Sequence, residues 1–308
     1  EAYGRDSVLT LDDGVDAQGN RQVRTDTVTV GGDGTINIIG DINTGGTRRQ
    51  ALVVDEFRTA NHSGTGDGRL SLILSGAIVG GDTENALIDA RNAARVELRS
   101  TVDISSGTAI LFGDGQTGHL LVADGARIRA TNSSLASEQE ALLVSQSGGL
   151  FENFGTLIED GEAGEPGSGE QKRSDGVLVK GGVFRNARTS DTRFGRVIVN
   201  GTAVELARAD STIINDGLIQ SRMEAAITTF PQFQDNPLFL TRNNARGVIS
   251  GAGAFTKAGA GTLSLSGNST FTGATSITAG ALALGGGGTS GWLSGTSGIN
   301  VDGTLQIW

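Results

Sequence analysis

Residues 251–284 constrain the fold more than any other segment, because apolar and small polar residues alternate there over several short runs. Alternation with a period of two places one face of a strand in a core and the other in solvent. Glycines interrupt the pattern every few residues, which favours tight turns because glycine enters positive φ without steric cost. The segment therefore predicts short β-strands with a shared core. Its core positions are Phe255, Leu263, Leu265, Phe271, Ile277, Leu282 and Leu284.

The same pattern extends through the preceding 250 residues, where helical periodicity is almost absent. Apolar triplets such as Val197–Val199 are followed by a polar turn and an alternating strand such as residues 200–207. Residues 84–99 are rich in Ala, Leu and Glu, but the alternation around Val96 and Leu98 favours two strands over a helix. Imperfect repetition of three short strands and three turns is what a parallel β-helix requires. The sequence thus predicts an all-β solenoid.

Asparagines recur at intervals that match one coil plus its loops. Asn153, Asn186, Asn215 and Asn244 lie 33, 29 and 29 residues apart. Asparagine is favoured at turns, and identical residues on successive coils can stack as ladders. We therefore expect these four residues to occupy equivalent turns, and we expect a β-helical body at 1–250 and a terminal region at 251–308.

Two segments break the rhythm and are expected to protrude as loops. Residues 159–175 contain no large apolar residue. Residues 228–241 hold Phe230, Phe233 and Phe239 with two of the three prolines, and proline cannot donate to a strand ladder. Exposed phenylalanines there would mark a contact site, although the same residues could fold back over an irregular coil.

Composition excludes several classes of function. The net charge of −10 argues against nonspecific binding to nucleic acid or anionic membranes. The chain has no apolar run of about 18 residues, the length a membrane-spanning helix needs. It also has no cysteine, which excludes disulfides and cysteine-ligated zinc.

Catalytic chemistry has little support in the sequence. The two histidines, His62 and His119, lie in no nucleophile motif, so we predict no catalytic residue, no cofactor and no metal site. Calcium stays open at turns that carry Asp33, Asp67, Asp82 and Asp114. A carbohydrate-active site assembled from distant coils also stays open, because stacked coils can bring such residues together.

Arginines supply a second candidate contact surface. Arg95, Arg99, Arg127 and Arg129 alternate with apolar residues, so all four should face outward on nearby coils. Such a stripe could bind sulfated glycans or acidic partners. Solvated strand faces with pairing to Glu97 explain the arginines equally well.

Residues 251–284 also resemble a known family motif, the passenger-associated transport repeat of Gram-negative autotransporters. The shared frame is Gly-x-Gly-x-Phe-x-Lys-x-Gly-x-Gly-Thr-Leu-x-Leu-x-Gly-x-x-x-Phe-x-Gly-x-Thr-x-Ile-x-x-Gly-x-Leu-x-Leu, with Lys257 at its lysine. The resemblance implies a right-handed parallel β-helix exported through the outer membrane and displayed at the bacterial surface or secreted. It also implies that the region around the repeat nucleates folding, and that a membrane barrel follows Trp308.

The resemblance further implies a function. We expect a non-enzymatic adhesin that promotes bacterial self-association, biofilm formation or attachment to host surfaces. Its partners would be identical passengers on neighbouring cells, or glycans and proteins of host surfaces and matrix. A carbohydrate-active β-helical enzyme and a structural stalk that presents an upstream domain are the alternatives.

Overall fold

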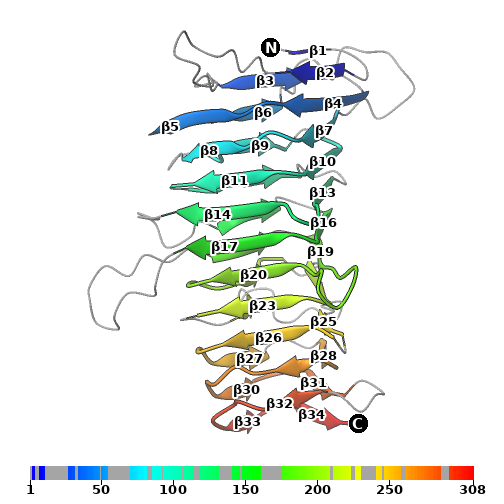
Figure 1. Ribbon diagram of the computed structural model, residues 1–308. Coiled ribbons are helices and arrows are strands. Elements are labelled where there is room, and N and C mark those ends of the chain that lie inside the picture. The colour runs from blue at the N-terminus through cyan, green and yellow to red at the C-terminus, as the bar shows by residue number, and fades with distance from the viewer. Residues whose placement is uncertain are drawn as a thin grey trace.

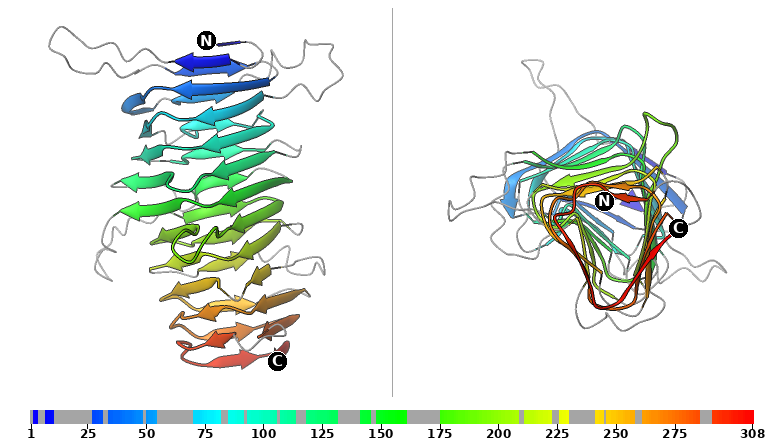
Figure 2. Two further views of the ribbon diagram at one scale, coloured as in Figure 1. Left: turned by 45° about the vertical axis from the view of Figure 1, so that its right-hand side comes forward. Right: turned by 90° about the horizontal axis from the view of Figure 1, so that it is seen from below.

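The chain forms a stack of short strands that runs from the N-terminal end at the top of Figure 1 to the C-terminal end at the bottom. The computed structural model describes residues 2–3, 7–10, 27–31, 34–48, 50–54, 70–81, 85–91, 93–105, 107–113, 118–131, 141–145, 148–160, 175–208, 211–222, 226–229, 241–244, 246–257, 261–285 and 291–308. Named strands pair in parallel, usually with the strand three places along the chain. Viewed along the stack, the strands outline three sides around one interior (Figure 2). The predicted parallel β-helix is confirmed.

Each side of the stack is a long parallel sheet. The nine-stranded sheet comprises β1 (Ala2–Tyr3), β3 (Val28–Gly31), β6 (Leu52–Val54), β9 (Ile88–Ala90), β12 (Ile110–Phe112), β15 (Ala141–Ser145), β18 (Asp175–Val179), β21 (Val204–Leu206) and β24 (Ile227–Thr229). The twelve-stranded sheet comprises β2 (Ser7–Thr10), β4 (Gly34–Ile39), β7 (Leu70–Leu74), β10 (Arg95–Leu98), β13 (His119–Val122), β16 (Gly149–Asn153), β19 (Gly182–Asn186), β22 (Ser211–Asn215), β25 (Thr241–Asn243), β28 (Thr262–Leu265), β31 (Ala281–Leu284) and β34 (Thr304–Ile307).

The ten-stranded sheet comprises β5 (Ile42–Arg48), β8 (Ile78–Gly81), β11 (Thr101–Ile104), β14 (Arg127–Thr131), β17 (Thr156–Asp160), β20 (Arg196–Val199), β23 (Leu218–Ser221), β26 (Val248–Gly251), β29 (Asn268–Ser269) and β32 (Trp292–Leu293). A three-stranded sheet comprises β27 (Phe255–Lys257), β30 (Thr275–Ile277) and β33 (Ile299–Val301). It continues the side formed by the nine-stranded sheet after β24, while the twelve-stranded and ten-stranded sheets run on without a break. The division at residue 250 stays a prediction.

A single apolar cluster fills the interior and extends from Val28 to Leu284. Along the strands, buried residues alternate with partly exposed ones, as in β7 and β10. The alternation inferred for residues 84–99 is correct, because β9 and β10 flank a turn at Arg91. Aromatic rings stack between coils: Phe151 and Phe184 have centroids 4.8 Å apart. One continuous core therefore joins successive coils, as expected of a solenoid.

A buried ladder of asparagines joins four successive coils at the ends of β16, β19, β22 and β25. The Nδ2 atom of Asn153 donates to Asn186 Oδ1 at 2.9 Å, that of Asn186 to Asn215 Oδ1 at 2.8 Å, and that of Asn215 to Asn243 Oδ1 at 2.7 Å. Asn186 Nδ2 also donates to the Leu218 carbonyl oxygen at 3.1 Å. All four side chains are at most 1% exposed.

The prediction that Asn244 is the fourth member of this ladder is wrong. Asn243 ends β25 with its side chain in the interior, whereas Asn244 begins the corner and bonds Asp216 Oδ1 at 2.8 Å. The physical reason is the period of two, since a shift of one residue moves a side chain to the other face. Glycines leave room for the ladder: a Cβ on Gly217 would collide with the carbonyl oxygen of Gly195.

Candidate binding surface

The structure divides the four predicted arginines between two sheets. Arg95 lies on β10 and Arg99 follows it, on the side formed by the twelve-stranded sheet. Arg127 and Arg129 lie on β14 of the ten-stranded sheet. All four alternate with buried residues, so they occupy outward positions on neighbouring coils, but they do not form one patch.

Arg95 and Arg99 share one carboxylate. Arg95 Nη2 lies 3.2 Å from Glu97 Oε2, and Arg99 Nε lies 2.6 Å from Glu97 Oε1. The Glu97 side chain is 14% exposed, whereas those of Arg95 and Arg99 are 46% and 49% exposed. The acid therefore lies close to the sheet, and the two guanidinium groups project beyond it.

A second shared carboxylate lies on the same sheet face. His119 Nε2 is 3.0 Å from Glu152 Oε2, and Arg185 Nη1 is 3.1 Å from Glu152 Oε1. The strands that carry these residues, β13, β16 and β19, are consecutive in the sheet, and β13 pairs with β10. Glu152 is again less exposed than its partners, at 17% against 30% for His119 and 48% for Arg185. The sequence did not connect His119 or Arg185 with the predicted arginine surface, because 24 or more residues separate each of them from Arg95.

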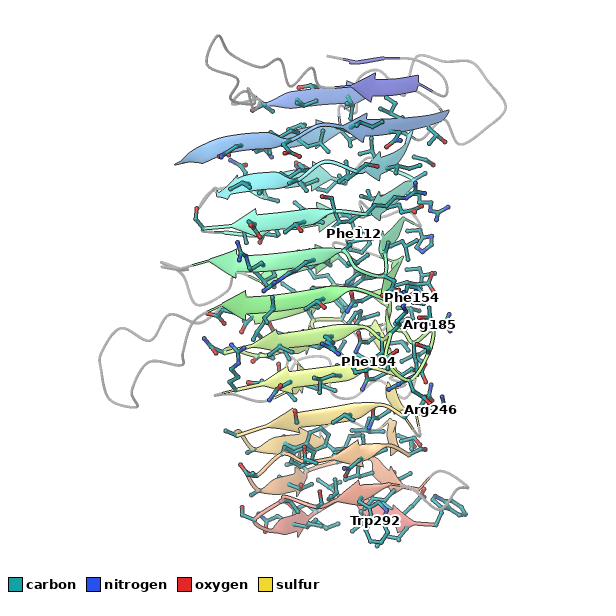
Figure 3. The ribbon with its side chains drawn as sticks, viewed as in Figure 1. Phe112, Phe154, Arg185, Phe194, Arg246 and Trp292 are labelled. Carbon is teal, nitrogen blue, oxygen red and sulfur yellow. The ribbon has the colours of Figure 1, made fainter. Side chains whose placement is uncertain are left out.

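An ordered loop, residues 188–194, covers the corner next to this face. Its ends form an antiparallel bridge, and the Arg188 and Arg196 guanidinium groups lie 4.6 and 4.8 Å from the Phe194 ring centroid. Two arginines pair around the loop: Arg193 with Asp124 at 3.3 Å and Arg246 with Asp191 at 2.7 Å. Figure 3 labels Phe194, Arg185 and Arg246 in this region. The loop therefore ties together coils that are distant in sequence.

Arg129 has a different role on the ten-stranded sheet. Its Nε and Nη2 atoms donate to the two carboxylate oxygens of Asp103 at 2.9 and 2.7 Å. Such a two-pronged pair holds both side chains in fixed geometry. Arg129 therefore links β14 to β11, and its guanidinium group is already paired with a carboxylate.

Two other sequence predictions fall outside the described residues. These are the aromatic contact site at Phe230, Phe233 and Phe239, and the calcium possibility at Asp33, Asp67, Asp82 and Asp114. Within the described ranges, no group of three or more His, Asp or Glu side chains is placed to hold a metal ion. In that part of the chain, no helix has the length and apolar character needed to cross a membrane.

Glu205 is a partly buried acidic side chain on the nine-stranded sheet. It lies on the outward side of β21, between the buried residues Val204 and Leu206. Burial raises its pKa above the ordinary value, and the nearby Lys180 charge opposes that rise. A raised pKa suits an acid catalyst, but a carbohydrate-active site also needs a gathered set of partners.

The terminal region has a compact interior. All seven core positions inferred from the sequence are buried: Phe255, Leu263, Leu265, Phe271, Ile277, Leu282 and Leu284. The rings of Phe255 and Phe271 stack with centroids 4.9 Å apart. Lys257 points into the same interior, is only 4% exposed, and donates from Nζ to the Ala279 carbonyl oxygen at 3.2 Å. Burial lowers its pKa from 10.5 to about 8.

Because the folded-state pKa of Lys257 is lower than the unfolded-state value, the unfolded chain binds more protons between these two pH values. Stability from this group therefore rises with pH from about 8 to 10.5 and is flat below that window. We expect Lys257→Met to remove this rise and to unfold at a urea concentration at least as high as wild type at pH 7. Urea unfolding at pH 7 and pH 10 measures this. Lys180→Met is the control, and an unchanged pH dependence in Lys257→Met would contradict the assignment.

Comparisons with known proteins agree with this architecture. Residues 255–284 match the family model of the passenger-associated transport repeat. Over 259 residues, 83% of this chain, the sequence is 30% identical to a protein of Brucella suis biovar 1 (strain 1330) named Adhesin BmaC autotransporter. The chain spans 6% of that relative's length. No solved structure matches the chain.

The fold and the match to the transport repeat define the class, a parallel β-helix that carries a passenger-associated transport repeat. Together with the similarity over most of the chain, they identify it as an autotransporter passenger segment.

Proposed function

We propose that this passenger segment is part of an adhesin displayed at the bacterial surface through the outer membrane. The similarity of most of the chain to a segment of an autotransporter adhesin carries the proposal. The long outer faces of the β-helix support it, because a rigid stack presents many polar side chains at fixed spacing. Weak contacts at each coil add up when many copies face one surface. Self-association, biofilm formation and host attachment are the adhesive outcomes that we propose to distinguish by experiment.

The test displays the full-length passenger on cells that do not aggregate, and compares it with a passenger that lacks residues 1–250. We expect the deletion to abolish either settling of the culture or attachment to coated surfaces. Loss of settling alone identifies self-association, and loss of attachment alone identifies host binding. Surface labelling and protease resistance of the remaining coils control for display and folding. Unchanged settling and attachment would refute the adhesin and favour a structural stalk.

A further inference from the structure

The outer side of β10, β13, β16 and β19 and the adjoining corner hold cations above a layer of acids. We name this surface the arginine face; it comprises Arg95, Arg99, Arg185 and Arg193 with the carboxylates beneath them. In each ion pair the base is more exposed than the acid: about half for Arg95, Arg99 and Arg185 against 14–17% for Glu97 and Glu152, and 70% for Arg193 against 40% for Asp124. An approaching ligand therefore meets guanidinium groups first.

The charge balance of the arginine face differs from that of the chain. Its four arginines face three carboxylates, Glu97, Glu152 and Asp124, so one positive charge is in excess before His119 is counted. The whole chain carries a net charge of −10. Two neighbouring acids, Asp191 and Asp216, are balanced in number by Arg246, which pairs with Asp191, and by Arg188, whose Nε donates to the Asp216 carbonyl oxygen. The face is therefore a local cationic strip on an acidic protein.

The arginines of this face are also held in place before any ligand arrives. Each shared carboxylate fixes two bases from below, while a guanidinium group has five N–H donors. Donors that remain after pairing point outward in fixed positions, which lowers the entropy lost on binding. Partly buried Leu121 lies between Glu97 and Glu152 in the register of the sheet, and partly buried Leu150 pairs with His119, so both give the strip an apolar floor.

We propose that the arginine face binds a linear anionic polysaccharide that carries sulfate or carboxylate groups. Planar guanidinium forks match the oxygens of both groups. The donors come from β10, β13 and β19 of one sheet, whose strands are about 4.8 Å apart, so a polymer laid along the stack can contact several coils at once. The apolar floor suits the carbon–hydrogen faces of sugar rings, as in other ligand sites. This inference names the partner of the adhesive surface and thus rests on the proposed function.

The test measures binding of the soluble chain to heparin, which carries sulfate, to polygalacturonate, which carries only carboxylate, and to polyglutamate, an acidic polypeptide. We expect binding to at least one polysaccharide, weakening as salt rises, and weaker binding to polyglutamate. Binding to heparin alone would indicate that the natural ligand is a sulfated polysaccharide. Binding to polygalacturonate as well would indicate a polysaccharide of uronate sugars. Equal or stronger binding of polyglutamate would overturn the proposal in favour of an acidic protein partner. If neither polysaccharide bound, the proposal would also be overturned.

The variant is Arg99→Gln with Arg185→Gln, which leaves Glu97 paired with Arg95 and Glu152 paired with His119. No buried acid then loses its last partner, so the fold should persist with an unchanged melting temperature. We expect the dissociation constant to rise about tenfold or more, since two charge-assisted contacts are lost. The matched control is Arg127→Gln with Arg196→Gln, which removes the same charge from outward positions on the ten-stranded sheet and should change binding less than about twofold.

Equal weakening by the control and the arginine-face variant would refute the site. The cell assay separates this inference from the function it rests on. If cells adhere although the chain binds no polysaccharide, only the proposal that the arginine face is the ligand site is refuted. If the chain binds polysaccharide but cells do not adhere, only the proposed adhesin function is refuted.

Discussion

Asn186→Ala is expected to lower the free energy of unfolding by about 3 kcal/mol, because it breaks the asparagine ladder at its centre. Asn186 accepts from Asn153 and donates to Asn215 and to the Leu218 carbonyl oxygen, at 2.8–3.1 Å. Alanine leaves these groups without that partner in an interior that water does not reach. A buried polar group that loses its partner costs about 1–3 kcal/mol, which makes the ladder more sensitive than an exposed bond. Urea unfolding followed by circular dichroism measures the effect.

Asn244→Ala is the matched control for the ladder. It deletes the same amide from a corner position, where the side chain makes one bond to Asp216 Oδ1 and is partly exposed. We expect a loss of about 1 kcal/mol or less, since water can replace that partner. If the two variants unfolded at the same urea concentration, the buried ladder would contribute no more to the free energy of unfolding than the partly exposed bond of Asn244.

The pair Asn243–Asn244 also shows how far sequence reasoning reaches. Coil-length spacing finds that asparagines recur at one corner, because each coil must return to the same point. It does not find which of two adjacent asparagines faces inward. That choice depends on where β25 ends, and a shift of one residue reverses the side of the sheet. The alternation of Val96 and Leu98 was sufficient for β10 because its pattern has no such ambiguity.

The arginine face could be predicted only in part. Alternation with apolar residues places Arg95 and Arg129 outward, but the sheet on which each lies depends on where the chain turns corners. Arg185 comes close to His119 through Glu152, across 33 residues of sequence from that acid, because three coils stack in register. Loop lengths between coils vary, so spacing alone cannot align such residues. The corner loop carries no sequence pattern that separates it from other polar turns.

Phe184→Ala is expected to have the largest effect, a loss of about 3–5 kcal/mol. The Phe184 ring is fully buried and stacks on Phe151 with an interplanar angle of 21°, and Phe151 in turn meets Phe112 edge to face at 6.2 Å. Alanine removes this contact area and leaves a cavity midway along the stack. Phe184→Leu keeps most of the volume and should lose less than about 1.5 kcal/mol.

Position along the stack determines where the Phe184 cavity acts. In a solenoid each coil is stabilised by its neighbours, so a defect weakens the two adjacent interfaces before it reaches distant ones. Amide hydrogen exchange should therefore accelerate in β16, β19 and β22 more than in β28 and β31. Val183→Ala changes the neighbouring outward side chain, which is partly exposed, and should leave exchange nearly unaltered. Uniform acceleration along all coils in Phe184→Ala would mean that the stack unfolds as one unit, and an unchanged urea midpoint would mean that neighbouring side chains fill the cavity without cost.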